Sequence, residues 1–218
     1  IPKFGLLIEL DMHNERNRKK QSKKVIKLLN KYDAEYQLET TPEEKEKLQK
    51  LTNSVSTVLS YNQDGKKAIP ILDDASIPLN RLSDYFSKIN ELFTAHKLKY
   101  TLWGHLLDGN FHLQPFFDLS QIGDRQKMLK LMSLYYDMII DLGGSTSGEN
   151  NDGRLRGAFL QKLYGNQINE LFSKIKTIFD PYSTLNPGVK VGVSLEDIKP
   201  IIRDEYSLNQ FYDHLLKS

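Results

Sequence analysis

Residues 100–115 read YTLWGHLLDGNFHLQP, and this stretch decides the fold. At its centre, Asp108-Gly109 is a dipeptide typical of a two-residue type I′ turn between antiparallel strands. Such a turn would place His105 directly opposite His112, with Cβ atoms roughly 5 Å apart on one face. The stretch therefore predicts an antiparallel hairpin that carries two neighbouring imidazoles.

Side chains alternate along this hairpin between an apolar face and a polar face. The apolar face suits a core and consists of Leu102, Gly104, Leu106, Phe111 and Leu113. The polar face has the composition of a binding-site wall and consists of Trp103, His105, Asn110, His112 and Gln114. Two imidazoles on one face could bind a single divalent metal, or they could be hydrogen-bonded residues on a sheet surface. A carboxylate nearby would favour the metal.

Beyond the hairpin, strand-like and helix-like patterns alternate along the chain. Strands are predicted over residues 4–10, about 34–39 and 68–74. Helices are predicted over about 15–31, from Thr41 as N-cap to about residue 60, after Pro78, over about 123–142, and twice more before Asp180-Pro181. This order predicts an α+β fold in which an antiparallel sheet is covered by helices.

Composition excludes several classes of function. Thirty basic and 28 acidic side chains leave a net charge of +2, which indicates neither a nucleic acid nor an anionic membrane as partner. The basic residues between 16 and 24 are interpreted as a solvated helix face rather than a phosphate site. The absence of cysteine excludes disulfides, a thiol nucleophile and an iron–sulfur centre. A chain without disulfides is compatible with residence in the cytoplasm.

No apolar run approaches the roughly 20 residues of a transmembrane helix. The chain starts at Ile1 without a methionine, so we expect a piece of something longer.

Residues 143–153, GGSTSGENNDG, form a polar and glycine-rich loop between two helix patterns. The loop lacks the lysine of a phosphate-binding P-loop and does not follow a strand. Its Glu149 is the natural third ligand beside the two histidines, although it could also serve only to cap the next helix. Two imidazoles and one carboxylate favour Zn²⁺, and after it Mn²⁺ or Fe²⁺, which can polarise a substrate oxygen.

Four segments together resemble the C-terminal, substrate-side domain of FAD-linked oxidases of the vanillyl-alcohol-oxidase type. This group includes D-lactate dehydrogenase, the glycolate oxidase flavoprotein subunit and D-2-hydroxyglutarate dehydrogenase. The segments are AIPILDDASIP (68–78), GHLLDGNFH (104–112), the loop from Gly143 to Arg156, and Phe179-Asp180-Pro181 through Asn186-Pro187-Gly188. The resemblance implies a ferredoxin-like cap domain over residues 1–190. It also implies a tail over 191–218 that packs on this domain or on a separate flavin-binding domain of the same polypeptide.

The resemblance also assigns roles to individual residues. His105, His112 and Glu149 match the family's metal ligands, which hold the hydroxyl and carboxylate of a small 2-hydroxy acid. Gln114 and Lys67 fall where such enzymes contact the substrate carboxylate. FAD would accept the hydride, and an electron acceptor of unspecified kind would reoxidise it.

Two departures from the family pattern bear on activity. The family usually has Glu-His where this chain has Glu149-Asn150, and an amide can hold a substrate oxygen but cannot accept its proton. Many members have a W-x-x-R motif where this chain has Gln49-Lys50-Leu51-Thr52, so a carboxylate-binding arginine is missing. The alternative is therefore a homologue that has lost catalysis and keeps a binding or structural role. A His₂Glu zinc hydrolase is less favoured, because no further base is evident beside the ligands.

Overall fold

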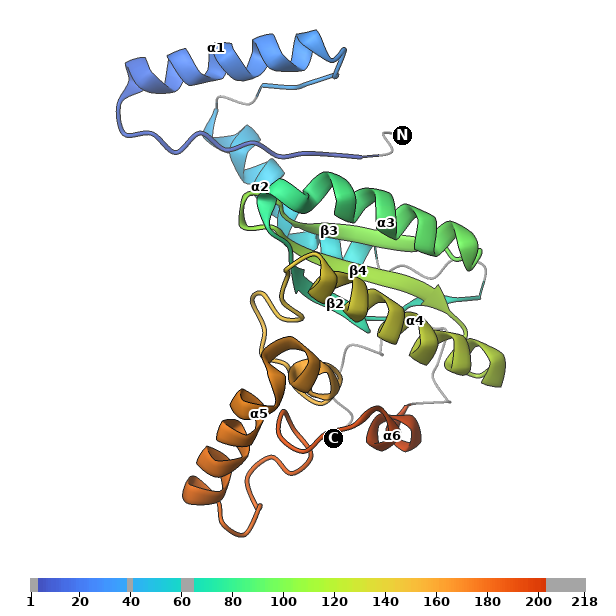
Figure 1. Ribbon diagram of the computed structural model, residues 1–218. Helices are drawn as coiled ribbons and strands as arrows, with labels where there is room; N and C mark the ends of the chain where they lie inside the picture. Colours follow the sequence, from blue (N-terminus) through green and yellow to red (C-terminus); the bar gives the residue numbers. More distant parts are fainter. Residues whose placement is uncertain (1–3, 39–40, 60–64, 203–218) are drawn as a thin grey trace. The chain divides into compact units, whose positions relative to one another are not determined.

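The computed structural model describes residues 4–38, 41–59 and 65–202 (Figure 1). Contacts divide the chain into two compact units, residues 1–52 and 53–218, and each is described by itself. Within the described residues, no helix combines the length and apolar character needed to cross a bilayer.

The first unit contains helix α1, Glu15–Lys31, which confirms the predicted helix. It begins after Asn14, whose side-chain oxygen accepts hydrogen bonds from the first-turn backbone amides. Residues 4–10 and 34–38 form no strand, so the strand predictions there were wrong, and residue 39 lies outside the described part. A β-like pattern becomes a strand only where another strand pairs with it, and among the described residues of the first unit neither segment has such a partner.

Helix α2, Pro42–Leu59, runs across the boundary between the two units. Thr41 caps it as predicted: the Thr41 hydroxyl accepts from the Glu44 amide, and the Glu44 carboxylate accepts from the Thr41 amide.

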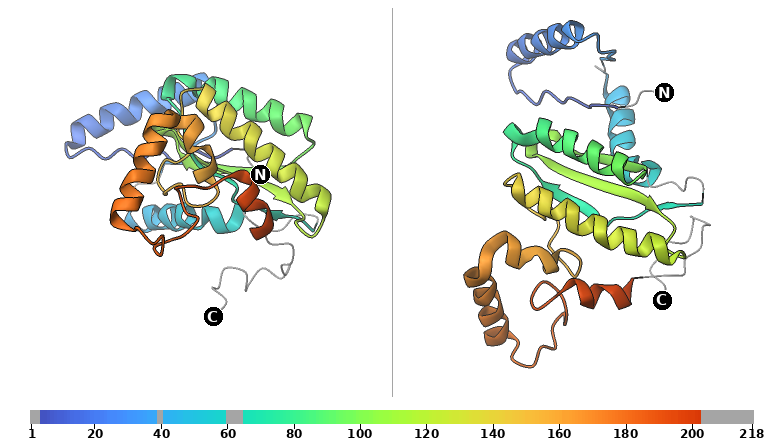
Figure 2. Two further views of the ribbon diagram at one scale, coloured as in Figure 1. Left: turned by 60° about the horizontal axis from the view of Figure 1, so that its bottom comes forward. Right: turned by 45° about the vertical axis from the view of Figure 1, so that its right-hand side comes forward.

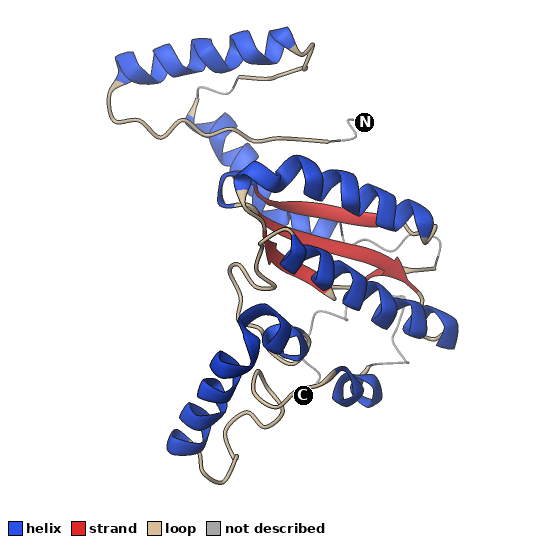
Figure 3. Ribbon diagram, viewed as in Figure 1, coloured by secondary structure: helices blue, strands red, loops and turns tan. Residues whose placement is uncertain are grey.

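A four-stranded antiparallel sheet forms the centre of the second unit (Figure 3). Strand β4, Asn110–Phe117, is its middle strand and pairs on one side with β3, Tyr100–His105. On its other side β4 pairs with β2, Leu72–Ser76, and with the short β1, Lys67–Ala68. The strand predicted over 68–74 is thus divided into β1 and β2.

Helices α3, Leu82–Ala95, and α4, Ile122–Asp141, lie side by side over one face of this sheet (Figure 2). A single turn of 3₁₀ helix, η1, Leu79–Arg81, leads into α3. The buried side chains of α3 and α4 that face the sheet are Tyr85, Ile89, Phe93, Met128, Leu131, Met132, Tyr135, Tyr136 and Ile139. The predicted α+β architecture, an antiparallel sheet covered by helices, is confirmed.

The remaining elements follow α4. They are the 3₁₀ turn η3, Arg156–Phe159; helix α5, Leu160–Phe179; helix α6, Leu195–Ile198; and the 3₁₀ turn η4, Lys199–Ile201. Helix α5 contains a kink at Gly165, whose φ of 79° is not helical. Ile198 is buried in the core of the second unit, so the start of the predicted tail packs on this unit. The rest of that tail, residues 203–218, lies outside the described part.

The hairpin between β3 and β4 differs from its predicted register by two residues. His112 pairs with Trp103, and His105 pairs with Asn110. The cause is the turn, because the 3₁₀ element η2, Leu106–Asp108, takes these residues out of the strand and Gly109 closes the loop with φ of 63°. The predicted two-residue turn was therefore wrong. A slip of two residues leaves each side chain on its own face, so the apolar and polar faces are as predicted.

Candidate functional site

The site lies where a bulge in β2 faces His112. Leu72 pairs with Leu113 and Ala75 pairs with Phe111, so Asp73 and Asp74 together oppose the single residue His112. Such bulges add a residue to one strand and redirect side chains, and they are frequent next to functional sites. Asp74 has a positive φ of 67°, a conformation that aspartate tolerates better than most residues.

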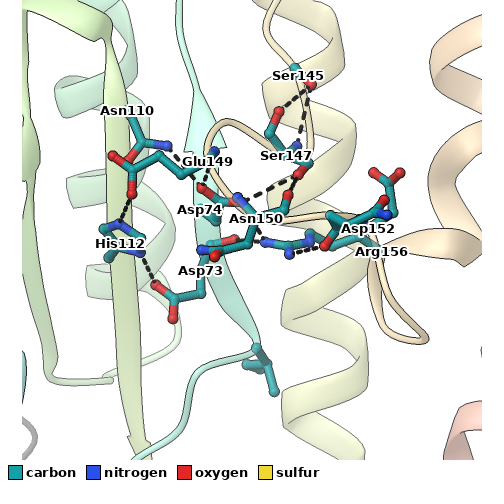
Figure 4. Close-up of polar contacts among 12 residues, drawn as sticks. Asp73, Asp74, Asn110, His112, Ser145, Ser147, Glu149, Asn150, Asp152 and Arg156 are labelled. Atoms are coloured by element: carbon teal, nitrogen blue, oxygen red, sulfur yellow. Dashed lines mark hydrogen bonds and ion pairs between the residues drawn. The ribbon is translucent and has the colours of Figure 1, made fainter. Parts of the chain in front are cut away.

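Asp74 anchors the loop that carries Glu149 (Figure 4). Its side chain is 1% exposed. One carboxylate oxygen accepts from the Glu149 amide at 2.7 Å and the Asn110 side chain at 3.0 Å. The other accepts from the Asn150 amide at 2.7 Å and from the side chains of Ser147 and Arg156, each at 3.2 Å. Burial alone would raise the pKa of Asp74, but these hydrogen bonds outweigh burial and lower it.

The loop lies directly against the sheet. The backbones of Ser145 and Ser76 exchange two hydrogen bonds of 2.8 and 3.0 Å, and the Gly148 amide donates to the Asp74 carbonyl at 2.8 Å. A Cβ atom on Gly148 would lie 2.1 Å from the Asn110 side-chain nitrogen, so any other residue here would displace the Asn110 side chain from its place beside Asp74. Two of the loop's glycines, Gly144 and Gly148, are thus explained by close contact with β2 and β4, and the other two, Gly143 and Gly153, have positive φ.

Both imidazoles of the polar face reach the Glu149 carboxylate. Nε2 of His105 lies 3.3 Å from Oε1 of Glu149, and Nε2 of His112 lies 3.5 Å from its Oε2. The His105 side chain is 61% exposed, that of Glu149 43% and that of His112 13%. Two histidines of the hairpin and a glutamate from the loop over residues 143–153 therefore meet, and the side chains of His105 and Glu149 remain accessible.

The ring of His112 also contacts Asp73 and Trp103. Its Nδ1 lies 2.8 Å from Oδ1 of Asp73, and its ring stacks on Trp103 with centroids 5.6 Å apart and planes inclined by 17°. The hydrogen bond to Asp73 is the main cause that raises the pKa of His112, while burial acts in the opposite direction. These contacts orient the ring so that its Nε2 faces Glu149.

These donors fit a divalent metal. Zinc binds imidazole nitrogen and carboxylate oxygen at about 2.0 to 2.2 Å, and a tetrahedral site with such bonds has neighbouring ligand atoms about 3.3 Å apart. Each imidazole lies near that distance from a different oxygen of Glu149, His105 from Oε1 and His112 from Oε2. Among the described residues, Asp74, His112 and Glu149 have ligand atoms within 4.8 Å of one another, a set without His105. Each oxygen of Asp74 already accepts at least two hydrogen bonds, so His105, whose side chain is 61% exposed, is the alternative candidate for the third ligand.

The other residues predicted for the site lie in different surroundings. Gln114 is buried and donates to Oδ2 of Asp73 at 3.3 Å. The exposed Asn150 is bound to Asp74 through its backbone amide. Lys67 pairs with Phe117, five residues along β4 from His112, or about 16 Å at the rise of a strand.

Sequence reasoning assigned no role to Asp73, Asp74 or Arg156. Arg156 donates to the Asp73 carbonyl at 2.9 Å in addition to its contact with the Asp74 carboxylate. The available signal was an acidic pair at the end of an apolar strand, since a carboxylate buried there requires donors from elsewhere in the chain. The pair alone did not indicate which donors these are.

Comparisons with known proteins identify the family of the chain. The family model "FAD linked oxidases, C-terminal domain" matches residues 3–189. The chain is 30% identical over 131 residues to D-2-hydroxyglutarate dehydrogenase of Haemophilus influenzae, which covers 60% of this chain and 13% of that protein. It is 30% identical over 149 residues to D-lactate dehydrogenase of Archaeoglobus fulgidus, which covers 68% of this chain and 31% of that protein. The chain thus spans less than a third of the length of these relatives. Because the family model covers most of the sequence, the chain belongs to the family of the C-terminal domains of FAD-linked oxidases.

Proposed function

We propose that this chain is the substrate-side domain of an FAD-dependent oxidoreductase that oxidises a D-2-hydroxy acid. In this proposal His105, His112 and Glu149 hold one divalent metal. The main support is the meeting of two imidazoles at one glutamate carboxylate, in a chain related to enzymes named as dehydrogenases of D-lactate and D-2-hydroxyglutarate. FAD would be held mainly by another domain of the same polypeptide.

The ligand set favours Zn²⁺, with Mn²⁺ or Fe²⁺ next, because imidazole and carboxylate are borderline to hard donors. When bound, such an ion supplies a Lewis acid that lowers the pKa of a substrate hydroxyl. The protein's part is to keep the ligands in place: Asp74 fixes the backbone of Glu149, and the sheet fixes His112. The exposed His105 and Glu149 leave one side of the site open to a small acid.

FAD, when bound, supplies the acceptor for a hydride. The 2-hydroxy acid would lose its hydroxyl proton to a base and its α-hydrogen, with the electron pair, to the flavin, which leaves a 2-oxo acid. Asn150 can donate a hydrogen bond to a substrate oxygen but cannot serve as that base. Lys67 and Gln114 as contacts of the substrate carboxylate, the electron acceptor and cytoplasmic residence all stay predictions.

Flavin bleaching in the full-length protein tests this proposal. The FAD-loaded protein is mixed anaerobically with a panel of D-2-hydroxy acids that includes lactate, glycolate and 2-hydroxyglutarate, and flavin absorbance is followed. We expect reduction by at least one of them, and its loss in Glu149→Gln. Asp108→Asn is the matched control, because Asp108 is an exposed carboxylate in the neighbouring turn. Absence of flavin reduction with every acid of the panel would contradict the proposal.

A second candidate is a flavoprotein homologue that has lost catalysis and keeps a binding or structural role. It is favoured by Asn150, which stands where the family has a histidine base, and by Thr52, which stands where the family has a carboxylate-binding arginine. Thr52 is an exposed residue of α2, and its hydroxyl donates to the Leu48 carbonyl at 2.9 Å. Under this alternative, Asn150→His in the full-length protein would not raise turnover. A clear gain would identify a weakened but genuine enzyme.

A further inference from the structure

We infer that Asp73 is a positioning residue, which fixes the tautomer and ring orientation of His112 so that its Nε2 lone pair is available to a metal. This inference rests on the proposed function and deepens it. Asp73 belongs to the bulge of β2, and its carboxylate meets the ring nitrogen on the side opposite Glu149 (Figure 4).

The tautomer follows from the acceptor. Ionised carboxylates only accept hydrogen bonds, so the Nδ1 atom of His112, 2.8 Å from Oδ1 of Asp73, must carry a proton. In a neutral ring the proton on Nδ1 leaves Nε2 without one, and Nε2 is the nitrogen that faces Glu149 at 3.5 Å. Asp73 thereby selects the tautomer that a metal requires.

Asp73 is itself held in place. Its Oδ2 accepts from the buried amide of Gln114 at 3.3 Å, and its backbone carbonyl accepts from Arg156 at 2.9 Å. The stack of Trp103 on His112 opposes rotation of the imidazole ring about its Cβ–Cγ bond. Gln114 therefore acts in this structure as a donor to Asp73.

His105 has a different environment. Its side chain is largely exposed, and its Nε2 lies 3.3 Å from Oε1 of Glu149. The two proposed ligands thus differ, because Asp73 and Trp103 orient the ring of His112, whereas the side chain of His105 is 61% exposed. Loss of an outer partner of a ligand histidine typically lowers metal affinity by about 10- to 100-fold.

The test measures tautomer and metal affinity in the full-length protein and in its Asp73→Ala, Asp73→Asn and Asp118→Ala variants. Asp118 is the matched control: it is also partly buried, accepts hydrogen bonds from Ser120, and lies six residues along from His112. The ¹⁵N chemical shifts of metal-free protein at alkaline pH report which ring nitrogen of each histidine carries the proton. Competition with a zinc-binding dye gives the affinity.

We expect His112 of the wild type to carry its proton on Nδ1, and Asp73→Ala to lose this preference while His105 is unchanged. Zinc affinity should fall by about 10- to 100-fold in Asp73→Ala and less in Asp73→Asn, which keeps one acceptor oxygen. Asp118→Ala should leave both readouts unchanged. An unaltered tautomer in a folded Asp73→Ala protein would overturn the inference. A wild type with the expected tautomer and no zinc binding would instead contradict the proposed metal site, because the tautomer is measured without metal.

Discussion

Asp74→Asn is the substitution that tests the anchoring of the Glu149 loop. Asparagine matches aspartate in shape and tolerates the positive φ at this position, so backbone strain is not added. Its amide group must replace one of two oxygens, and each oxygen accepts at least two hydrogen bonds in the native protein. In either orientation, at least two donors lose their acceptor.

The expected cost follows from those lost partners. A buried donor without an acceptor costs about 1 to 3 kcal/mol, so two of them, at about 1.5 kcal/mol each, reduce the free energy of unfolding by about 3 kcal/mol. In a protein of this size, each kcal/mol lowers Tm by about 2 to 4 °C. We therefore expect Tm to fall by about 6 to 12 °C, and zinc affinity to fall with it because the Glu149 backbone loses its bond to Asp74.

Thermal unfolding followed by circular dichroism, with a zinc titration at a temperature where both proteins are folded, measures these effects. Asp84→Asn is the control, since its exposed carboxylate makes a surface ion pair with Arg81 and should change stability by less than about 1 kcal/mol. An Asp74→Asn protein with the wild-type Tm and the wild-type zinc affinity would refute the reasoning.

Three further predictions follow from the same site. His112 has a raised pKa in the folded protein, so its contribution to stability is complete below pH about 6.5 and is lost as pH rises through the folded value; denaturation of metal-free protein at several pH values should show this step, and His112→Gln should lack it. Zinc affinity should increase over the same rise in pH, because protons then compete less for the ring, and a pH-independent affinity would be inconsistent with His112 as ligand. Gly148→Ala should destabilise the protein and weaken zinc binding, since its Cβ would meet the Asn110 side chain at 2.1 Å, whereas Gly123→Ala, where nothing lies within 4 Å, should do neither; equal melting temperatures for the two variants would contradict the close contact.

The sequence predicted the local features of this fold well. The amphipathic patterns identified α1, α3 and α4, and the Thr41 cap marked the start of α2, because helical periodicity and capping depend on residues within a few positions of each other. The strands expected over 4–10 and 34–39 were not found in the described residues, because a strand also requires a partner that its own pattern does not name.

The candidate site shows the same division between local and distant information. The polar face of the hairpin was predicted from alternation, even though the turn was wrong, because an error of two residues preserves the face. The approach of Glu149 to the two histidines was expected from chemistry and resemblance. The network that produces this approach, from the bulge at Asp73 and Asp74 to Arg156, depends on contacts between residues more than 70 positions apart. Such contacts leave no periodic signal in a single sequence.

Metal content is the most direct measurement of the central claim, that His105, His112 and Glu149 hold one divalent ion. The full-length protein is expressed with its flavin, dialysed against metal-free buffer and analysed by inductively coupled plasma mass spectrometry, alongside Glu149→Gln and the control Asp108→Asn. The account predicts about one equivalent of zinc, manganese or iron per chain in the wild type and the control, and a large loss in Glu149→Gln. A wild type without bound metal after zinc loading, or a Glu149→Gln protein that retains all of its metal, would contradict it.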